Sequence, residues 1–140
     1  GYVGEPVSFA DEDEAEVYAR KTYASFGQLG DADWGLMTRI TFRRNGAGRL
    51  VLAYDPAIAE TFVGQPIPDL DLWPVWDRIT QPTLLLRGVD SDLLLEETAQ
   101  QMTERGPKAS LVTFPGCGHA PSLMEARQIK TVVDWLERPA

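Results

Sequence analysis

The apolar positions of this chain follow two different patterns. In the first half they recur at helical spacing, and in the second half they gather in two short unbroken runs. The helical spacing predicts a helix that starts after Ser8 and ends near Gly27, followed by a second helix capped by Asp31. The unbroken runs at 83–87 and 110–114 predict strands that are covered on both faces.

From residue 82 onward the pattern predicts the order strand, helix, strand, helix. Helices are expected over 93–104 and from Pro121 or Ser122 to the end of the chain, whereas the proline-rich stretch 64–74 is predicted to connect the two halves. The last helix carries an apolar stripe of Ile129, Val132, Val133 and Leu136, which are expected to face inward. This order is typical of an α/β fold with a parallel sheet. Two or three parallel strands make a poor sheet, so the tail is expected to be the end of a larger one.

The candidate chemistry lies just after the two predicted strands. His119, the only histidine, follows the second strand within Gly-Cys-Gly-His-Ala-Pro, and an imidazole can exchange a proton near neutral pH. The first strand is followed by a turn that carries Asp90 and Asp92. Because the carboxyl ends of parallel strands meet at one edge of a sheet, these three side chains are expected to emerge there together. Either aspartate could instead cap the next helix.

These segments resemble the last two strands of an α/β-hydrolase. The resemblance rests on Trp-Asp-Arg-Ile-Thr-Gln-Pro-Thr-Leu-Leu-Leu-Arg-Gly at 76–88, on Ser91-Asp92, and on Pro-Gly-Cys-Gly-His-Ala-Pro at 115–121. In that family the triad runs serine, acid, histidine along the chain. The resemblance therefore implies that His119 is the general base and that Asp92, rather than Asp90, orients it.

The resemblance also implies how the chain is divided. Residues 1–66 resemble the mostly helical lid that some members insert before these strands, and residues 67–140 resemble the C-terminal portion of the parallel-sheet core. Trp34 and Phe62, which precede the boundary, are expected to line a substrate pocket beneath the lid.

The family's Gly-x-Ser-x-Gly nucleophile motif is absent from these residues. Ser25 comes closest, but Tyr23 replaces the first glycine and the segment resembles a helix end. We therefore expect the nucleophile and the oxyanion donors on an N-terminal half outside this sequence. The parent protein is expected to be a serine-type hydrolase of a small, mostly apolar ester, or of a carbon–carbon bond. The isolated chain is expected to be inactive.

Two other functions remain open at this point. The chain could be a non-catalytic binding or assembly module, since an unfinished sheet exposes an edge and apolar faces that allow self-association into a homo-oligomer. An aspartate or cysteine nucleophile on the absent half would instead give a dehalogenase or an epoxide hydrolase. Cys117 lies too close to His119 along one loop to serve as that nucleophile, and is expected to fill a tight turn.

The composition narrows the classes of partner. The 140 residues are 44% hydrophobic and 24% charged, as in a folded domain, and the net charge of −8 argues against nucleic acid. No apolar run reaches the ~20 residues that span a bilayer, so no membrane contact is expected.

One histidine and one cysteine are too few for a zinc site, and no phosphate-binding glycine loop predicts a cofactor. The single cysteine suits a reducing compartment, which favours a cytoplasmic location. The expected partners are a small-molecule substrate and the absent N-terminal half.

Overall fold

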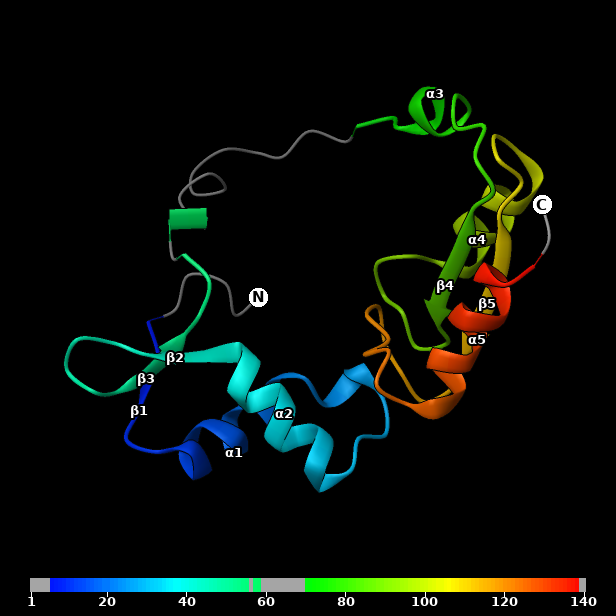
Figure 1. Ribbon diagram of the computed structural model, residues 1–140. Coiled ribbons are helices and arrows are strands. Elements are labelled where there is room, and N and C mark those ends of the chain that lie inside the picture. The colour runs from blue at the N-terminus through cyan, green and yellow to red at the C-terminus, as the bar shows by residue number, and fades with distance from the viewer. Residues whose placement is uncertain (1–5, 56, 59–69, 139–140) are drawn as a thin grey trace. The chain divides into compact units, whose positions relative to one another are not determined.

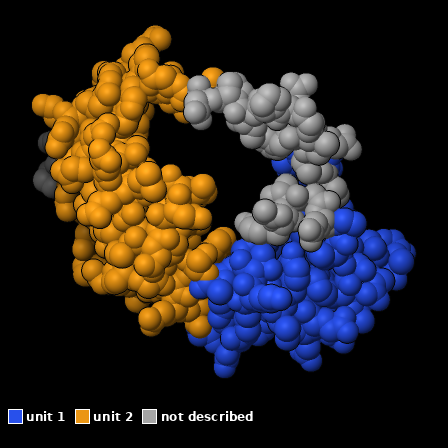
Figure 2. All heavy atoms as spheres, turned by 180° about the vertical axis from the view of Figure 1, so that it is seen from behind, with its two compact units in different colours: residues 1–24, 30–69 blue, residues 25–29, 70–140 orange. Residues whose placement is uncertain are grey.

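A computed structural model of the chain describes residues 6–55, 57–58 and 70–138 (Figure 1). The described residues fall into two compact units (Figure 2). The first unit lies within 1–24 and 30–69, and the second lies within 25–29 and 70–140. The short stretch 25–29 therefore belongs with the C-terminal half of the chain, although in sequence it lies between two helices of the first unit.

The first unit combines helices with a small antiparallel sheet of strand order β1-β3-β2. Its elements are β1 (Ser8–Phe9), α1 (Glu12–Thr22), α2 (Asp31–Thr41), β2 (Phe42–Arg44) and β3 (Leu50–Leu52). A 3-10 turn, η1 (Ala24–Phe26), follows α1. The helical spacing predicted both helices, but β1 and β2 were not predicted. A strand of only two or three residues is too short to show a period.

Helix α1 begins later than the sequence predicted. Asp11 is the N-cap, and its carboxylate accepts a hydrogen bond from the Glu14 N–H at 3.0 Å. Ser8 lies in β1 instead, where its hydroxyl accepts from Arg49 Nε at 3.1 Å. The expectation that the helix starts directly after Ser8 was therefore wrong, because the serine is engaged in tying β1 to the following hairpin.

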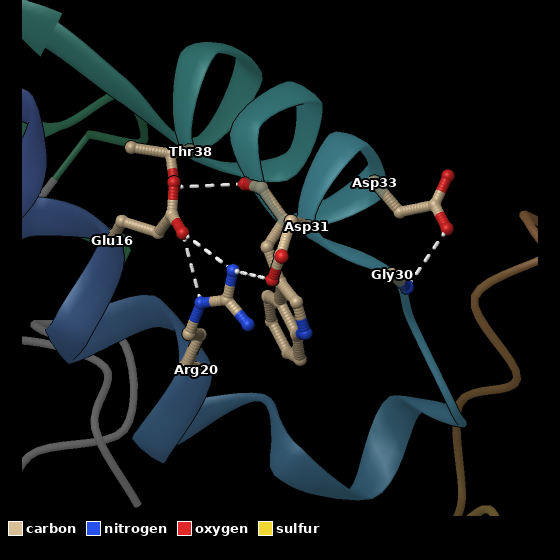
Figure 3. Close-up of polar contacts among 7 residues, drawn as sticks. Glu16, Arg20, Gly30, Asp31, Asp33 and Thr38 are labelled. Atoms are coloured by element: carbon tan, nitrogen blue, oxygen red, sulfur yellow. Dashed lines mark hydrogen bonds and ion pairs between the residues drawn. The ribbon is translucent and has the colours of Figure 1, made fainter.

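Small residues let α1 and α2 pack closely. Ala15 and Ala19 are fully buried on α1. At the edge of this contact Arg20 donates to Glu16 on its own helix and to Asp31 at the start of α2, at 2.8 Å in each case (Figure 3). Because the pair of Arg20 with Asp31 is exposed to solvent, it adds little to the free energy of folding.

The second unit is built on two parallel strands, β4 (Leu84–Gly88) and β5 (Ser110–Phe114), which lie side by side (Figure 1). Their register pairs Leu84 with Ser110 and Gly88 with Phe114, so both strands end at the same edge. The helices are α3 (Trp73–Trp76), α4 (Glu96–Glu104) and α5 (Ala126–Leu136). The predicted parallel strands are confirmed, whereas α4 and α5 start later than predicted because loops occupy their first residues.

The apolar stripe of α5 is largely exposed in the described structure. Ile129, Val133 and Leu136 are 46%, 42% and 68% exposed, so the described residues leave most of this face uncovered. A helix with one apolar face packs it against another layer in a complete α/β fold. The prediction that these are inner positions is not met by this chain alone.

Helix α3 is held against the end of α4 through Arg105. The guanidinium of Arg105 makes a bidentate pair with the Asp77 carboxylate and lies 4.4 Å from the ring centroid of Trp73. The indole N–H of Trp76 donates to the Arg105 carbonyl at 3.2 Å. The hydrogen bonds from Arg105 lower the pKa of the Asp77 carboxyl below its ordinary value.

This lowered pKa predicts an acid-sensitive contact. A carboxyl whose folded pKa is depressed adds stability that is complete above its ordinary value of about 3.9 and is lost as the pH falls through the folded pKa. Asp77→Asn should therefore lower the urea midpoint at pH 7 and reduce its decline between about pH 5 and pH 2. Asp134→Asn, at an exposed ion pair within α5, is the matched control. Equal pH dependence in the wild-type and Asp77→Asn proteins would contradict this account.

Candidate active site

Residues 89–95 follow β4 and are here called the acid-bearing loop, and residues 115–125 follow β5 and are here called the histidine loop. The two loops are joined by hydrogen bonds between their backbones. The Val89 N–H donates to the Phe114 carbonyl at 2.8 Å, and the Asp90 N–H donates to the Cys117 carbonyl at 3.0 Å. Gly116 turns the second loop with φ at +71°, a conformation that favours glycine. The two loops thus form one surface at the carboxyl edge of the parallel strands, as the sequence predicted.

Gly88 is the point of closest approach between these loops. A Cβ added there would overlap the carbonyl oxygens of both Gly118 and Cys117. Backbone atoms cannot move aside as a flexible side chain can, so only glycine allows the loops to meet. This contact fixes how closely the loop that carries His119 approaches the end of β4.

His119 is exposed, and its ring contacts Ser91. The distance from Nδ1 to the Ser91 hydroxyl is 3.3 Å. The same hydroxyl accepts from the Leu94 N–H at 3.0 Å, which fixes its position in the turn before α4. Ser91 is only 8% exposed. A buried, already oriented hydroxyl therefore holds one nitrogen of an exposed imidazole.

The sequence did not predict this role for Ser91, which entered only as part of the Ser91-Asp92 segment of the family resemblance. A serine followed three residues later by a backbone donor at a helix start is a common local turn. Such a turn involves neighbouring residues alone, so it does not indicate a contact with a histidine from another loop.

The two candidate acids lie on the same loop as Ser91 and are exposed. Among the described residues, the carboxylate of Asp92 makes no hydrogen bond or ion pair. Asp90 is engaged through its backbone, where its N–H donates to the Cys117 carbonyl. The structure thus brings His119 to the acid-bearing loop, but Ser91 rather than Asp92 contacts the ring. The orienting role of Asp92 stays a prediction.

Cys117 is part of the histidine loop and is fully buried, and its thiol donates to the Phe114 carbonyl at 3.4 Å. Burial raises the pKa of the Cys117 thiol, and the negative charges of Glu125 and Asp90 raise it further. A thiol with a raised pKa is a poor nucleophile because the reactive thiolate is disfavoured. Cys117 therefore fills the turn, which agrees with the sequence interpretation.

Trp34 and Phe62 are the two residues predicted to line a substrate pocket. Trp34 is 7% exposed and lies on α2 of the first unit, with the Arg20 guanidinium carbon 5.5 Å from its ring centroid. Phe62 lies outside the described residues. The substrate-binding role of both residues stays a prediction. Ser25 lies in η1 directly after a helix, so no strand precedes it as a nucleophile turn requires.

A hollow of about 740 Å³ lies between α3 and α4. Its lining includes Leu72, Trp73, Trp76 and Met102. None of the residues of the histidine loop or of the acid-bearing loop lines it, so the hollow is separate from the candidate active site.

Two further features are absent from the described part of the chain. No cluster of three histidine, cysteine, aspartate or glutamate side chains there could hold a metal ion. No helix in those ranges combines the length and the apolar character needed to cross a bilayer.

Comparison with known proteins extends these observations. The sequence profile of the alpha/beta hydrolase family matches residues 4–135. The chain is 34% identical over 137 residues to a 3-hydroxybutyrate-oligomer hydrolase of Cupriavidus necator, covering 91% of this chain and 46% of the relative. It is 36% identical over 66 residues to a pimeloyl-[acyl-carrier protein] methyl ester esterase of Nitrosomonas europaea, covering 47% of this chain and 26% of the relative.

Solved structures give the same result. The crystal structure of an alpha/beta hydrolase from Novosphingobium aromaticivorans superposes with a TM-score of 0.83 at 35% identity, covering 99% of this chain and 50% of that one. The chain thus spans at most about half the length of these similar proteins.

The close approach at Gly88 predicts a strong effect of one methyl group. Gly88→Ala should destabilise the second unit by about 2 kcal/mol or more, because the added carbon meets immobile backbone atoms. Gly46→Ala is the matched control, since a Cβ there meets no atom within 4 Å, and it should change stability by no more than about 0.5 kcal/mol. Urea unfolding followed by circular dichroism measures both variants. Equal midpoints for the two variants would contradict the close approach of the loops at Gly88.

Proposed function

Because this chain belongs to the alpha/beta hydrolase family, we propose that the protein containing it is a serine-type hydrolase of a small, mostly apolar carboxylic ester. The observation that carries the proposal is the contact of His119 Nδ1 with Ser91, which lies on the acid-bearing loop. This contact joins the imidazole to the loop that carries Asp92, the proposed orienting acid. The serine nucleophile and the oxyanion donors would come from residues outside this chain.

In the proposed reaction His119 acts twice. Its ring takes the proton of the serine hydroxyl as that oxygen attacks the ester carbonyl, and then returns the proton to the leaving alcohol. Water then attacks the acyl-enzyme with the same ring as base, and the serine hydroxyl regains its proton. The exposed position of the ring suits this role, because both the nucleophile and the leaving group must reach it.

The proposed role of Asp92 is to hold Nδ1 and stabilise the imidazolium. Asp92 directly follows Ser91, whose hydroxyl contacts this nitrogen, and the proposed role requires its carboxylate to take over that contact. Asp90 is less suited, because its backbone is tied to the Cys117 carbonyl beneath the loop.

The ester substrate is supported by the names of two relatives. One is named for hydrolysis of 3-hydroxybutyrate oligomers and the other for cleavage of a methyl ester. Both names fit carboxylic esters of short acids. We infer that nitrophenyl esters of short acyl chains are suitable probes of the complete protein.

Substitution of the proposed base and acid tests this function in the complete protein. His119→Ala and Asp92→Asn should each lower kcat by about three orders of magnitude or more, because the proton transfer loses its base or its orientation. Asp90→Asn and Cys117→Ala serve as controls and should retain most of the activity. Initial rates with nitrophenyl acetate and butyrate give the comparison. Full activity of His119→Ala would overturn the proposed function, and a larger loss in Asp90→Asn than in Asp92→Asn would reassign the acid.

The 140-residue chain alone should show no esterase activity above the buffer rate, because it contains no Gly-x-Ser-x-Gly segment. Removal of even one oxyanion donor costs about 10²–10³ in rate, and here the nucleophile would be absent as well. The same nitrophenyl ester assay on the purified chain measures this. Turnover by the chain alone that disappears in its His119→Ala variant would show that the machinery is complete within these residues.

A further inference from the structure

Residues 25–29, here called the clasp segment, lie against the histidine loop. The Gly118 N–H donates to the Ser25 carbonyl at 2.6 Å, and the Ser122 N–H donates to the Phe26 carbonyl at 3.0 Å. A Cβ on Gly118 would lie 3.0 Å from the Ser25 Cβ, so the two backbones are in close contact. The two hydrogen bonds are on either side of His119 along the chain and tie its loop to the clasp segment.

The clasp segment is itself held by Glu125. One carboxylate oxygen of Glu125 accepts from the Gln28 N–H at 3.0 Å. Gly27 has φ at +130°, and a Cβ there would overlap the same oxygen. The backbone conformation of Gly27 favours glycine, and any larger residue would also have to push this carboxylate aside. Glu125 is half-buried and is the N-cap residue of α5, where the helix dipole favours a negative charge.

We propose that Glu125 is a positioning residue for His119, because its carboxylate holds the clasp segment against the loop that carries the imidazole. The inference rests on the proposed function, in which His119 is the base. The exposed ring of His119 contacts Ser91, whereas the backbone on both sides of His119 in sequence is held by the clasp segment. A base displaced by about 1 Å can cost a hundredfold in rate, so such support matters for catalysis.

Three variants of the complete protein test the proposal, together with one control. Glu125→Ala removes the acceptor of the Gln28 N–H, whereas Glu125→Gln keeps an oxygen that can accept the same hydrogen bond. Gly27→Ala breaks the same contact from the side of the clasp segment and serves if Glu125→Ala does not fold. Glu137→Ala is the matched control, because Glu137 is an exposed glutamate at the other end of α5.

Two measurements are made on each variant. The first is the hydrogen exchange of the Gly118 and Ser122 amides, which reports the clasp without any need for activity. The second is kcat and KM with a nitrophenyl ester. In Glu125→Ala we expect faster exchange at both amides and a kcat lowered by about tenfold to a hundredfold, with KM changed less than about twofold. Glu125→Gln should restore both quantities, and Glu137→Ala should leave them unchanged.

The other outcomes overturn the proposal. Unchanged exchange at Gly118 and Ser122 in both Glu125→Ala and Gly27→Ala would show that Glu125 does not hold the clasp segment. Faster exchange with an unchanged kcat, or with a change in KM alone, would show that the clasp segment does not position the base. A failure of the proposed function would look different. His119→Ala would then keep full activity, while exchange at the Gly118 and Ser122 amides would still show whether Glu125 holds the clasp segment.

Discussion

The close approach of two loop backbones at Gly88 determines the geometry of the candidate active site. No side chain separates the end of β4 from the Cys117 and Gly118 carbonyls, so the two loops behave as one surface. Hydrogen bonds from Val89 and Asp90 across this contact add direction to it. The position of the loop that carries His119 is therefore set by backbone atoms rather than by mobile side chains. The contacts of the imidazole depend on that position.

The exposure of His119 raises the question of how an accessible ring stays oriented. A buried base would be rigid but could not meet a nucleophile and a leaving group. Here the ring is open while its surroundings are tied down, by the Ser91 hydroxyl at Nδ1 and by Ser25 and Phe26 beside the loop. The buried Cys117 packs within the same loop, where its thiol donates to the Phe114 carbonyl. Accessibility and rigidity are thus divided between the side chain and the backbone around it.

Elements with long sequence patterns were predicted, and elements with short ones were not. The runs at 83–87 and 110–114 are long and apolar enough to indicate buried parallel strands, and parallel pairing placed the two loops at one edge. The two-residue and three-residue strands of the first unit have too few positions for a period to show. Helix α5 begins later than predicted, because residues 121–125 are held in the loop. The contact of Ser91 with His119 and the docking of residues 25–29 join positions distant along the chain, and no local pattern encodes such pairs.

The assignment of residues 25–29 to the second unit has a consequence for exchanging segments between relatives. A chimera made by transplanting residues 1–69 as a block would carry a foreign stretch into the neighbourhood of His119, since the support for that loop is encoded between the first two helices. Such a swap changes the surroundings of the candidate active site even when the C-terminal sequence is left untouched. A graft that keeps residues 25–29 native would separate the effect of the transplanted part from the integrity of the loop that these residues hold.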